Sequence, residues 1–280
     1  MKKLKIVVIL FLAFVTVSCK KDEKINPKDA GGYTGRGITY GNKGLFDEAI
    51  KDFTKAIRVN PKYAKAYYRR GAAYAAKGLY DEAIEDYTKA IQIDSKDAEA
   101  YNNRGIAYRE KGLSDEAIKD YTKAMQINPK YANAYLNRGI AYVLKGLFDE
   151  AIEDCTKTIQ INPKLAESYY TRGIAYGKKE LHNAAIEDYT KAIQIDPKLA
   201  GAYLNRGIAY VEKGLYDESI KDCTKAIQIN PRYAEAYYNR GAAYSGKGLF
   251  KLCISDWKKA ADLGLKEARK SLKEYFNIDY

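Results

Sequence analysis

The sequence has a single histidine, His182, among 280 residues, and it lacks the residue sets on which most catalytic sites depend. One histidine leaves little room for acid–base catalysis or for a zinc site. The chain shows no Ser-His-Asp set, no paired histidine and cysteine, no metal-ligand spacing and no phosphate-binding loop. We therefore expect no enzyme activity, no cofactor and no metal site, and an enzyme is the weakest of the alternative functions.

Acidic residues are in deficit, since 36 Asp and Glu stand against 48 Lys and Arg, for a formal net charge of +12. This surplus keeps open the alternative that the protein binds nucleic acid or another polyanion. Two rows of lysines at 34-residue steps, Lys43 to Lys247 and Lys55 to Lys259, are however matched by Asp and Glu in the same units. We therefore expect no nucleic-acid partner.

The first nineteen residues have the pattern of a signal peptide. Lys2, Lys3 and Lys5 are basic, and residues 6–17 form an uncharged apolar run. Twelve residues are too few to span roughly 30 Å of hydrocarbon, but they suit the apolar region of a signal peptide. The polar residues 20–29 that follow are predicted to be a tether.

The end of this segment, Thr16-Val17-Ser18-Cys19, resembles a bacterial lipoprotein signal, in which the cysteine becomes the lipid-modified first residue of the mature protein. Thr16 departs from the usual pattern, which has an aliphatic residue there. The resemblance implies a lipid anchor on Cys19 and a location on a membrane of the bacterial cell envelope, facing the periplasm or the surface. The alternatives are a plain secretory signal or an uncleaved anchor, with Cys19 incidental.

A period of 34 residues runs through the rest of the chain. An Arg-Gly dipeptide recurs at this step, with one tyrosine four residues before each glycine and another three after it. The seven glycines are Gly37, Gly71, Gly105, Gly139, Gly173, Gly207 and Gly241. All six prolines fall at one phase of the same period. Such self-similarity predicts stacked units, none of which can bury its apolar face alone.

Each unit is predicted to be a pair of helices. We interpret Asn128-Pro129 as the start of a first helix, because Asn can cap a helix and Pro suits its first turn. Gly146 is predicted to end that helix in the left-handed conformation. Asp149 and Glu150 are predicted to lie in the first turn of the second helix, at the positive end of its dipole.

These residues resemble the signature of the tetratricopeptide repeat, with its aromatic, small, tyrosine, alanine and proline positions at fixed spacing. The resemblance covers residues 30–263 and implies an all-α, right-handed solenoid of seven helix-turn-helix repeats. The predicted repeats span 30–63, 64–97, 98–131, 132–165, 166–199, 200–233 and 234–264. Residues 265–280 are predicted to form a capping helix and tail, with Leu265, Ala268, Leu272, Tyr275 and Phe276 facing inward.

Arginine replaces the usual leucine before each glycine, and an aspartate stands fifteen residues after each glycine. We predict that these residues pair in a ladder along the solenoid, because a partly buried arginine needs a partner. The rival interpretation is a row of seven exposed arginines that binds anions.

In the tetratricopeptide family the first helix of each pair lines a concave groove that holds a peptide. The resemblance places the following residues on that surface: Tyr68, Asn102, Asn103, Arg109, Leu136, Asn137, Val143, Tyr170, Leu204, Asn205, Val211, Tyr238 and Asn239. Aromatic, aliphatic and amide side chains suit an extended or helical peptide, because amides can satisfy its backbone. Ile106, Ile140, Ile174 and Ile208 would form an apolar floor or, alternatively, pack between repeats.

We therefore predict a non-catalytic scaffold for protein–protein interaction on the bacterial cell envelope. Its partners are an unidentified protein or peptide and, through the lipid anchor, a membrane. Self-association stays open.

Overall fold

The computed structural model describes residues 29–280. The predicted signal peptide, Cys19 and nearly all of the tether lie outside the described residues. Within them the structure has fifteen α-helices and no strand, which confirms the predicted all-α fold class. None of these helices is both long and apolar enough to cross a bilayer.

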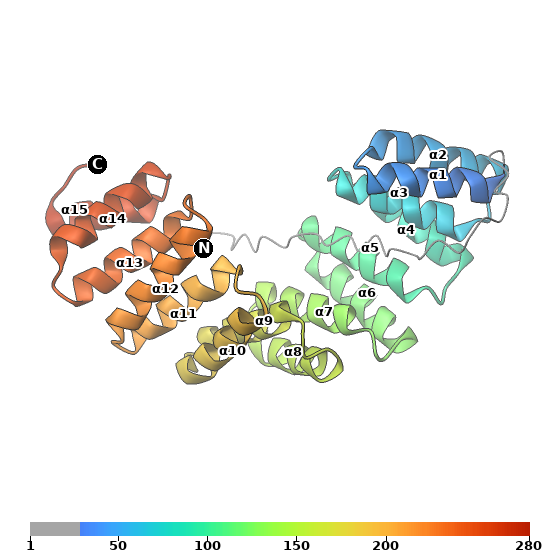
Figure 1. Cartoon of the computed structure of the whole chain (residues 1–280). Helices are drawn as coiled ribbons and strands as arrows, with labels where there is room; N and C mark the ends of the chain where they lie inside the picture. The colour runs from blue at the N-terminus through green and yellow to red at the C-terminus, as the bar shows by residue number, and fades with distance from the viewer. Residues whose placement is uncertain (1–28) are drawn as a thin grey trace. The chain divides into compact units, whose positions relative to one another are not determined.

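The chain divides into two compact units, the first ending at Pro129 and the second running from Lys130 to Tyr280 (Figure 1). Unit 1 holds α1 (Ala30–Asn42), α2 (Phe46–Val59), α3 (Ala64–Ala76), α4 (Tyr80–Ile93), α5 (Ala98–Glu110) and α6 (Ser114–Ile127). Unit 2 holds α7 (Ala132–Lys145), α8 (Phe148–Ile161), α9 (Ala166–Lys178), α10 (His182–Ile195), α11 (Ala200–Glu212), α12 (Tyr216–Ile229), α13 (Ala234–Gly246), α14 (Phe250–Asp262) and α15 (Lys266–Phe276).

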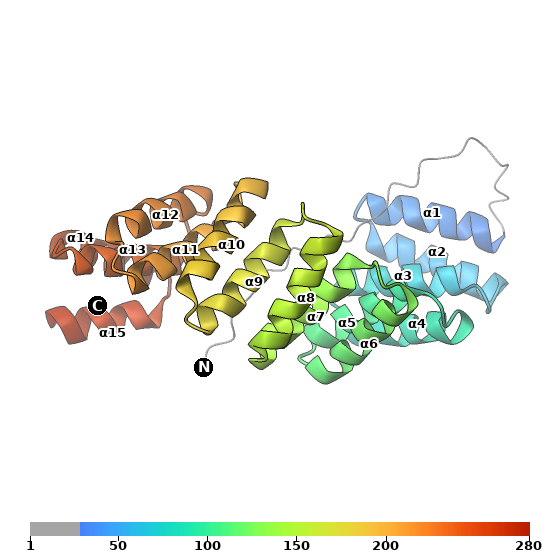
Figure 2. The same ribbon diagram turned by 90° about the horizontal axis from the view of Figure 1, so that it is seen from below.

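Consecutive helices form hairpins, and the hairpins stack in sequence order within each unit. The odd-numbered helix of each pair packs against the even-numbered helix that follows it, and that helix packs against the next hairpin. Neighbouring odd-numbered helices also touch, as α7 touches α9 and α11 touches α13. Figure 2 shows the hairpins of unit 2 following one another from α7 to α15. The predicted solenoid of helical hairpins is therefore confirmed.

The Asn-Pro pair between repeats does not start a helix, so that interpretation was wrong. Asn128 is the C-terminal cap of α6, and α7 begins at Ala132. The equivalent Asn60 caps the end of α2, and its side chain accepts a hydrogen bond from the backbone N–H of Lys62 at 3.0 Å. An asparagine that bonds the backbone two residues on makes a turn, which competes with helix capping for the same side chain.

The turn inside each hairpin follows the prediction. Gly146 ends α7 with φ of 78°, a left-handed conformation that glycine adopts without steric cost. The acidic Asp149 and Glu150 lie in the first turn of α8, as predicted. Glu180 occupies the corresponding position in the fifth repeat with φ of 60°, so the backbone keeps this conformation without glycine.

The two helices of a hairpin come into close contact where the repeated glycine lies. A Cβ atom on Gly173 would stand 2.7 Å from the Tyr189 ring, so the aromatic side chain packs directly on the α9 backbone. Small buried side chains such as Ala175 and Ala185 continue this core. The 34-residue recurrence of glycine therefore reflects the space that the second helix needs.

The capping helix α15 is present, but one of the residues predicted to face inward is largely exposed. Ala268 and Leu272 are fully buried, whereas Tyr275 is 72% exposed. Leu272 and Phe276 pack with Trp257 in the last hydrophobic cluster. The Tyr275 ring lies 5.8 Å from the Trp257 ring, so it touches the edge of this cluster while most of the side chain stays exposed.

Candidate functional site

Every repeat contains an ion pair between its two helices. Nε and Nη2 of the repeated arginine donate to the two oxygens of an aspartate sixteen residues later, with N···O distances of 2.5 to 2.9 Å. The pairs are Arg36–Asp52, Arg70–Asp86, Arg104–Asp120, Arg138–Asp154, Arg172–Asp188, Arg206–Asp222 and Arg240–Asp256. This confirms the predicted pairing, and the rival row of free arginines is wrong.

The same arginines connect consecutive repeats within each unit. Nη1 of Arg172 donates to the Thr156 hydroxyl of the preceding repeat at 2.9 Å, and four other arginines repeat this contact. The Arg172 guanidinium also lies 5.9 Å and 5.8 Å from the ring centroids of Tyr169 and Tyr176. Each of the three guanidinium nitrogens thus donates a hydrogen bond within the protein, so we assign the ladder to the scaffold rather than to ligand binding.

Electrostatics differ between the first pair and those inside the stack. The Arg36 guanidinium lowers the pKa of the Asp52 carboxyl by hydrogen bonding to it. Burial instead raises the pKa of Asp86, Asp154 and Asp188, although their arginines oppose the shift. These three carboxylates are therefore held in a drier environment, which is typical of a structural element.

A second set of contacts links the hairpin turns. Lys77 pairs with Asp47, Lys111 with Asp81, Lys179 with Asp149 and Lys247 with Asp217. Lys213 instead donates to Asn183, because asparagine replaces the aspartate in the fifth repeat. Four lysines of the Lys43–Lys247 row are thus already engaged by acids of the neighbouring repeat.

The predicted groove residues all lie on first helices, which are α3, α5, α7, α9, α11 and α13. Five of them are buried: Asn102, Arg109, Leu136, Val143 and Leu204. The remaining eight are half-buried: Tyr68, Asn103, Asn137, Tyr170, Asn205, Val211, Tyr238 and Asn239. Ile140 and Ile174 are also buried, while Ile106 and Ile208 are half-buried. A ligand on this surface would therefore meet chiefly the half-buried set.

Tyrosines and asparagines of successive first helices bond to each other. In unit 1, Asn103 donates to the Tyr68 hydroxyl at 2.8 Å, and that hydroxyl donates to Glu99 at 3.3 Å. In unit 2, Asn205 donates to the Tyr170 hydroxyl at 3.2 Å. These bonds hold the side chains in place, so the surface is organised before any ligand arrives.

Sequence reasoning missed the acidic residues at the second position of several first helices. Glu99, Glu167 and Glu235 lie near the start of their helices, and Asn103 and Asn239 follow one turn later on the same side. We call this row of residues the first-helix stripe. Comparing this position across repeats would have identified them, since residues three or four apart share one helix face.

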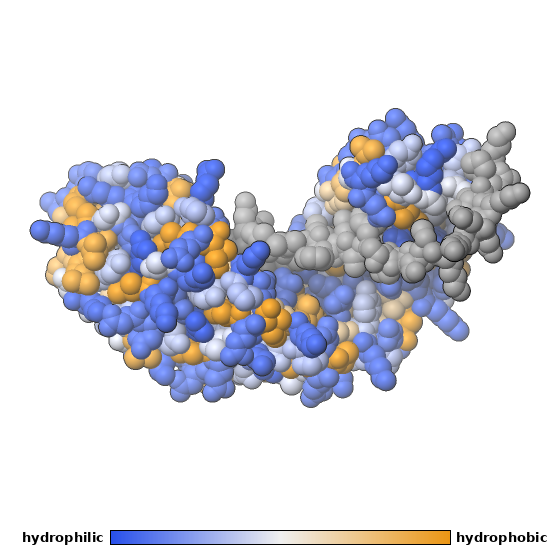
Figure 3. Space-filling view, viewed as in Figure 1, coloured by the Kyte–Doolittle hydropathy of each residue, from blue (hydrophilic) through white to orange (hydrophobic). Residues whose placement is uncertain are grey.

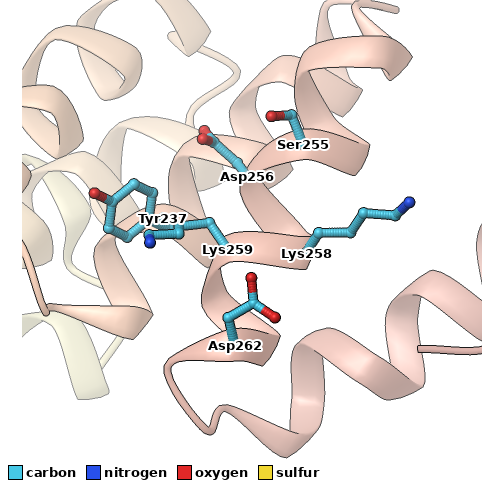
Figure 4. Close-up of a pocket in the computed structure, with 6 residues that line it drawn as sticks. All are labelled: Tyr237, Ser255, Asp256, Lys258, Lys259 and Asp262. Carbon is cyan, nitrogen blue, oxygen red and sulfur yellow. The ribbon is translucent and has the colours of Figure 1, made fainter.

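Two shallow pockets lie away from this stripe. One of about 390 Å³ is lined by Tyr237, Ser255, Asp256, Lys258, Lys259 and Asp262 of α13 and α14 (Figure 4). The Asp256 carboxylate there is already bound by Arg240. Another, of about 430 Å³, surrounds the fifth-repeat turn from Glu180 to Ala184 beside Lys213. Neither contains a nucleophile paired with a base.

The cysteines of the described region are not arranged for chemistry. Cys155, Cys223 and Cys253 are buried and form no disulfide among the described residues. Burial raises the pKa of Cys223 to about 12 and that of Cys253 to about 11. A thiol with a raised pKa is a poor nucleophile at neutral pH. Residues 29–280 also contain no group of three or more His, Cys, Asp and Glu able to hold a metal ion.

Comparison with protein families identifies the repeat. Three tetratricopeptide repeat models match residues 34–98, then 98–131 and 132–165, then 182–214 and 209–248. The chain belongs to the tetratricopeptide repeat family, whose members generally mediate protein–protein interaction and are generally not enzymes. A search of curated proteins finds no match.

Solved structures share the fold. A tetratricopeptide repeat protein from Parabacteroides merdae is 22% identical with a TM-score of 0.68, over 87% of this chain and 97% of that one. YrrB, described as a TPR protein with an unusual peptide-binding site, is 24% identical with a TM-score of 0.54, over 66% and 95%. A chain of the Cut9–Hcn1 heterotetramer is 20% identical, with a TM-score of 0.70 over 78% of this chain. The match spans only 43% of the length of that heterotetramer chain.

Proposed function

We propose that this protein is a non-catalytic scaffold that binds a peptide or an extended segment of a partner protein along its first helices. The observation that carries the proposal is the contrast between two sets of repeated residues. One set consists of the arginine, aspartate, glycine and paired tyrosine positions, whose side chains or backbone pack within the scaffold. The other set is the half-buried stripe on the first helices, whose residues differ from repeat to repeat. Variation on an otherwise constant scaffold is where a specific partner can be recognised.

The chemistry of the stripe supports a peptide ligand. Tyr170 and Tyr238 offer area with little side-chain entropy to lose, and Asn205 and Asn239 offer amide groups that match a peptide backbone. The likeness to YrrB adds a precedent for peptide binding within this fold. Shallow pockets without paired catalytic groups favour binding over catalysis.

The proposal includes attachment to the bacterial cell envelope through a lipid on Cys19. Its support is the basic and apolar leader followed by Val17-Ser18-Cys19. A lipid on one end of the chain would leave the repeats free to present their first helices, whichever membrane face they occupy.

A photocrosslinking experiment in the producing cells tests the binding surface. The full chain carries a photoreactive residue at Asn239, on the first-helix stripe, or at Gln228, which is exposed on the second helix α12. We expect a discrete crosslinked partner from Asn239 and none from Gln228. Equal or absent crosslinking at both positions would show that the first helices are not the binding surface.

Attachment is tested separately with Cys19→Ser in the full chain. A lipid anchor predicts that the variant moves from the membrane fraction to the soluble fraction, because the acyl chains supply the membrane affinity. If the variant stays with the membrane, the leader acts as an uncleaved anchor and the lipoprotein proposal is wrong.

A further inference from the structure

One row of positions on the first helices of unit 2 carries net negative charge, opposite in sign to the protein as a whole. We define the acidic face as the stripe at the second, sixth, ninth and thirteenth positions of α9, α11 and α13, continued by the second, sixth and ninth positions of the shorter α15. Its carboxylates are Glu167, Glu212, Glu235, Glu267 and Glu274, and its one cation at these positions is Lys178. Positions with this spacing lie on one side of a helix.

Adjacent helices carry this stripe forward as a continuous surface. The bond from Asn205 to Tyr170 connects α11 to α9, and the bond between the Tyr238 and Ser271 hydroxyls, 3.0 Å apart, connects α13 to α15. The capping helix therefore occupies the place of a further first helix. Figure 3 shows apolar side chains surfacing between polar ones on this unit.

Two cations near the acidic face are engaged elsewhere, and a third, Lys270, pairs with Glu274 of the face itself at 3.5 Å. Lys179 and Lys247 pair with Asp149 and Asp217 at the hairpin turns. Glu212 and Glu235 are exposed and make no ion pair with any described residue. The negative charges of these two glutamates are thus exposed and are not neutralised by the scaffold.

Unit 1 presents a different charge pattern at the same positions. Lys65 and Arg69 stand on α3, and Arg69 lies over the Tyr68 ring at 5.5 Å. Lys65 takes the place of Glu167 and Glu235, and the two cations of α3 are balanced by Glu99 and Glu110 of α5. A net negative charge at these positions is therefore particular to unit 2.

We propose that the acidic face of unit 2 binds an extended peptide rich in lysine or arginine, with its glutamates pairing the basic side chains and Asn205 and Asn239 bonding the backbone. This inference rests on the proposed function and names its partner class. Long basic side chains can lay their apolar stems against Tyr170 and Tyr238 while their charges reach the carboxylates. Nucleic acid, heparin and anionic lipid would be repelled by the same carboxylates.

Fluorescence anisotropy with the detergent-solubilised full chain tests this proposal. The probes are three labelled peptides of equal length that alternate alanine with lysine, with glutamate or with serine. We expect the lysine peptide to bind at least about tenfold more tightly than the serine peptide at low salt, and to weaken as salt is raised. Tighter binding of the glutamate peptide, or no binding of any peptide, would overturn the proposal.

Charge reversal on the face supplies the matched comparison. Glu212→Lys with Glu235→Lys should weaken binding of the lysine peptide about tenfold or more. Glu153→Lys with Glu187→Lys makes the same change in net charge on the exposed side of α8 and α10, and should leave binding within about twofold. Equal losses in the two variants would mean that binding follows net charge, which also overturns the proposal.

The outcomes separate this inference from the proposed function. If Asn239 crosslinks a partner but the lysine peptide is not preferred, the first helices bind proteins and only the basic partner class is wrong. If the lysine peptide is preferred but charge reversal on the face has no effect, the acidic face is not where it binds. Loss of fold in a variant is excluded by matching helical circular dichroism and thermal melting.

Discussion

The first hairpin, α1 and α2, and an internal hairpin such as α3 and α4 contain the same ion pair in different surroundings. The Arg36 side chain is 46% exposed, whereas that of Arg70 is 18% exposed. Arg70 donates a third hydrogen bond to Thr54 of the preceding repeat. Contacts within a hairpin are thus the same throughout, and the contacts that a neighbour adds decide how buried each pair becomes.

The largest difference is expected when an aspartate is removed from inside the stack. Asp188→Ala leaves Arg172 half-buried without its carboxylate, at a cost of about 3–5 kcal/mol in the free energy of unfolding. Asp52→Ala should cost clearly less, because water can solvate Arg36. Chemical denaturation followed by circular dichroism measures both. The double variant Arg172→Met with Asp188→Leu should recover most of the loss, and equal losses for Asp188 and Asp52 would break the comparison.

A contact inside the hairpin should behave alike in both places. A Cβ on Gly37 would stand 2.6 Å from the Phe53 ring, and one on Gly173 would stand 2.7 Å from the Tyr189 ring. Gly37→Ala and Gly173→Ala should each destabilise by about 1–3 kcal/mol, because the aromatic ring must move. Gly177→Ala is the control, since its Cβ would meet only the Tyr189 hydroxyl at an ordinary 3.5 Å. Thermal melting distinguishes the three variants.

The first helix should also open more readily than an internal one. Besides Gly37, α1 contains Gly31, Gly32, Gly35 and Gly41, and each glycine in a helix interior costs about 1 kcal/mol relative to alanine. We expect backbone amides of α1 to exchange hydrogen at least about tenfold faster than those of α3 in native-state exchange. Slower exchange in α1 would contradict the view that a preceding neighbour and good helix formers protect the internal helices.

The smallest effect concerns the fifth-repeat turn. Glu180 holds a φ of 60°, which glycine adopts in the other hairpin turns. Glu180→Gly should stabilise by up to about 1 kcal/mol, because a side chain with Cβ is strained in this region. The reciprocal Gly214→Glu should destabilise by a similar amount, as measured by the midpoint of urea unfolding. A loss of stability in Glu180→Gly would show that the Glu180 side chain makes a compensating contact.

Much of the scaffold followed from the sequence because its determinants are local. The left-handed turn at Gly146 and the acids at the start of α8 depend on residues within one helical turn. The Arg–Asp pairing could also be predicted, since a residue repeated at every unit must have a partner repeated at the same period. The placement of Asn128 was wrong because the same side chain can cap a helix or form a turn, and local sequence does not choose between them.

The amino-acid sequence by itself determined the 34-residue period, the helical hairpins and the residues that stack between them, because each depends on spacing along one chain. Only the tertiary structure decided which side chains of the first helices stay accessible, that Tyr275 is largely exposed and that α15 takes the place of a further first helix. The exposure of a side chain depends on whether a neighbouring helix covers it. In a repeating sequence, equivalent positions carry nearly the same residue type whether or not such a helix is present.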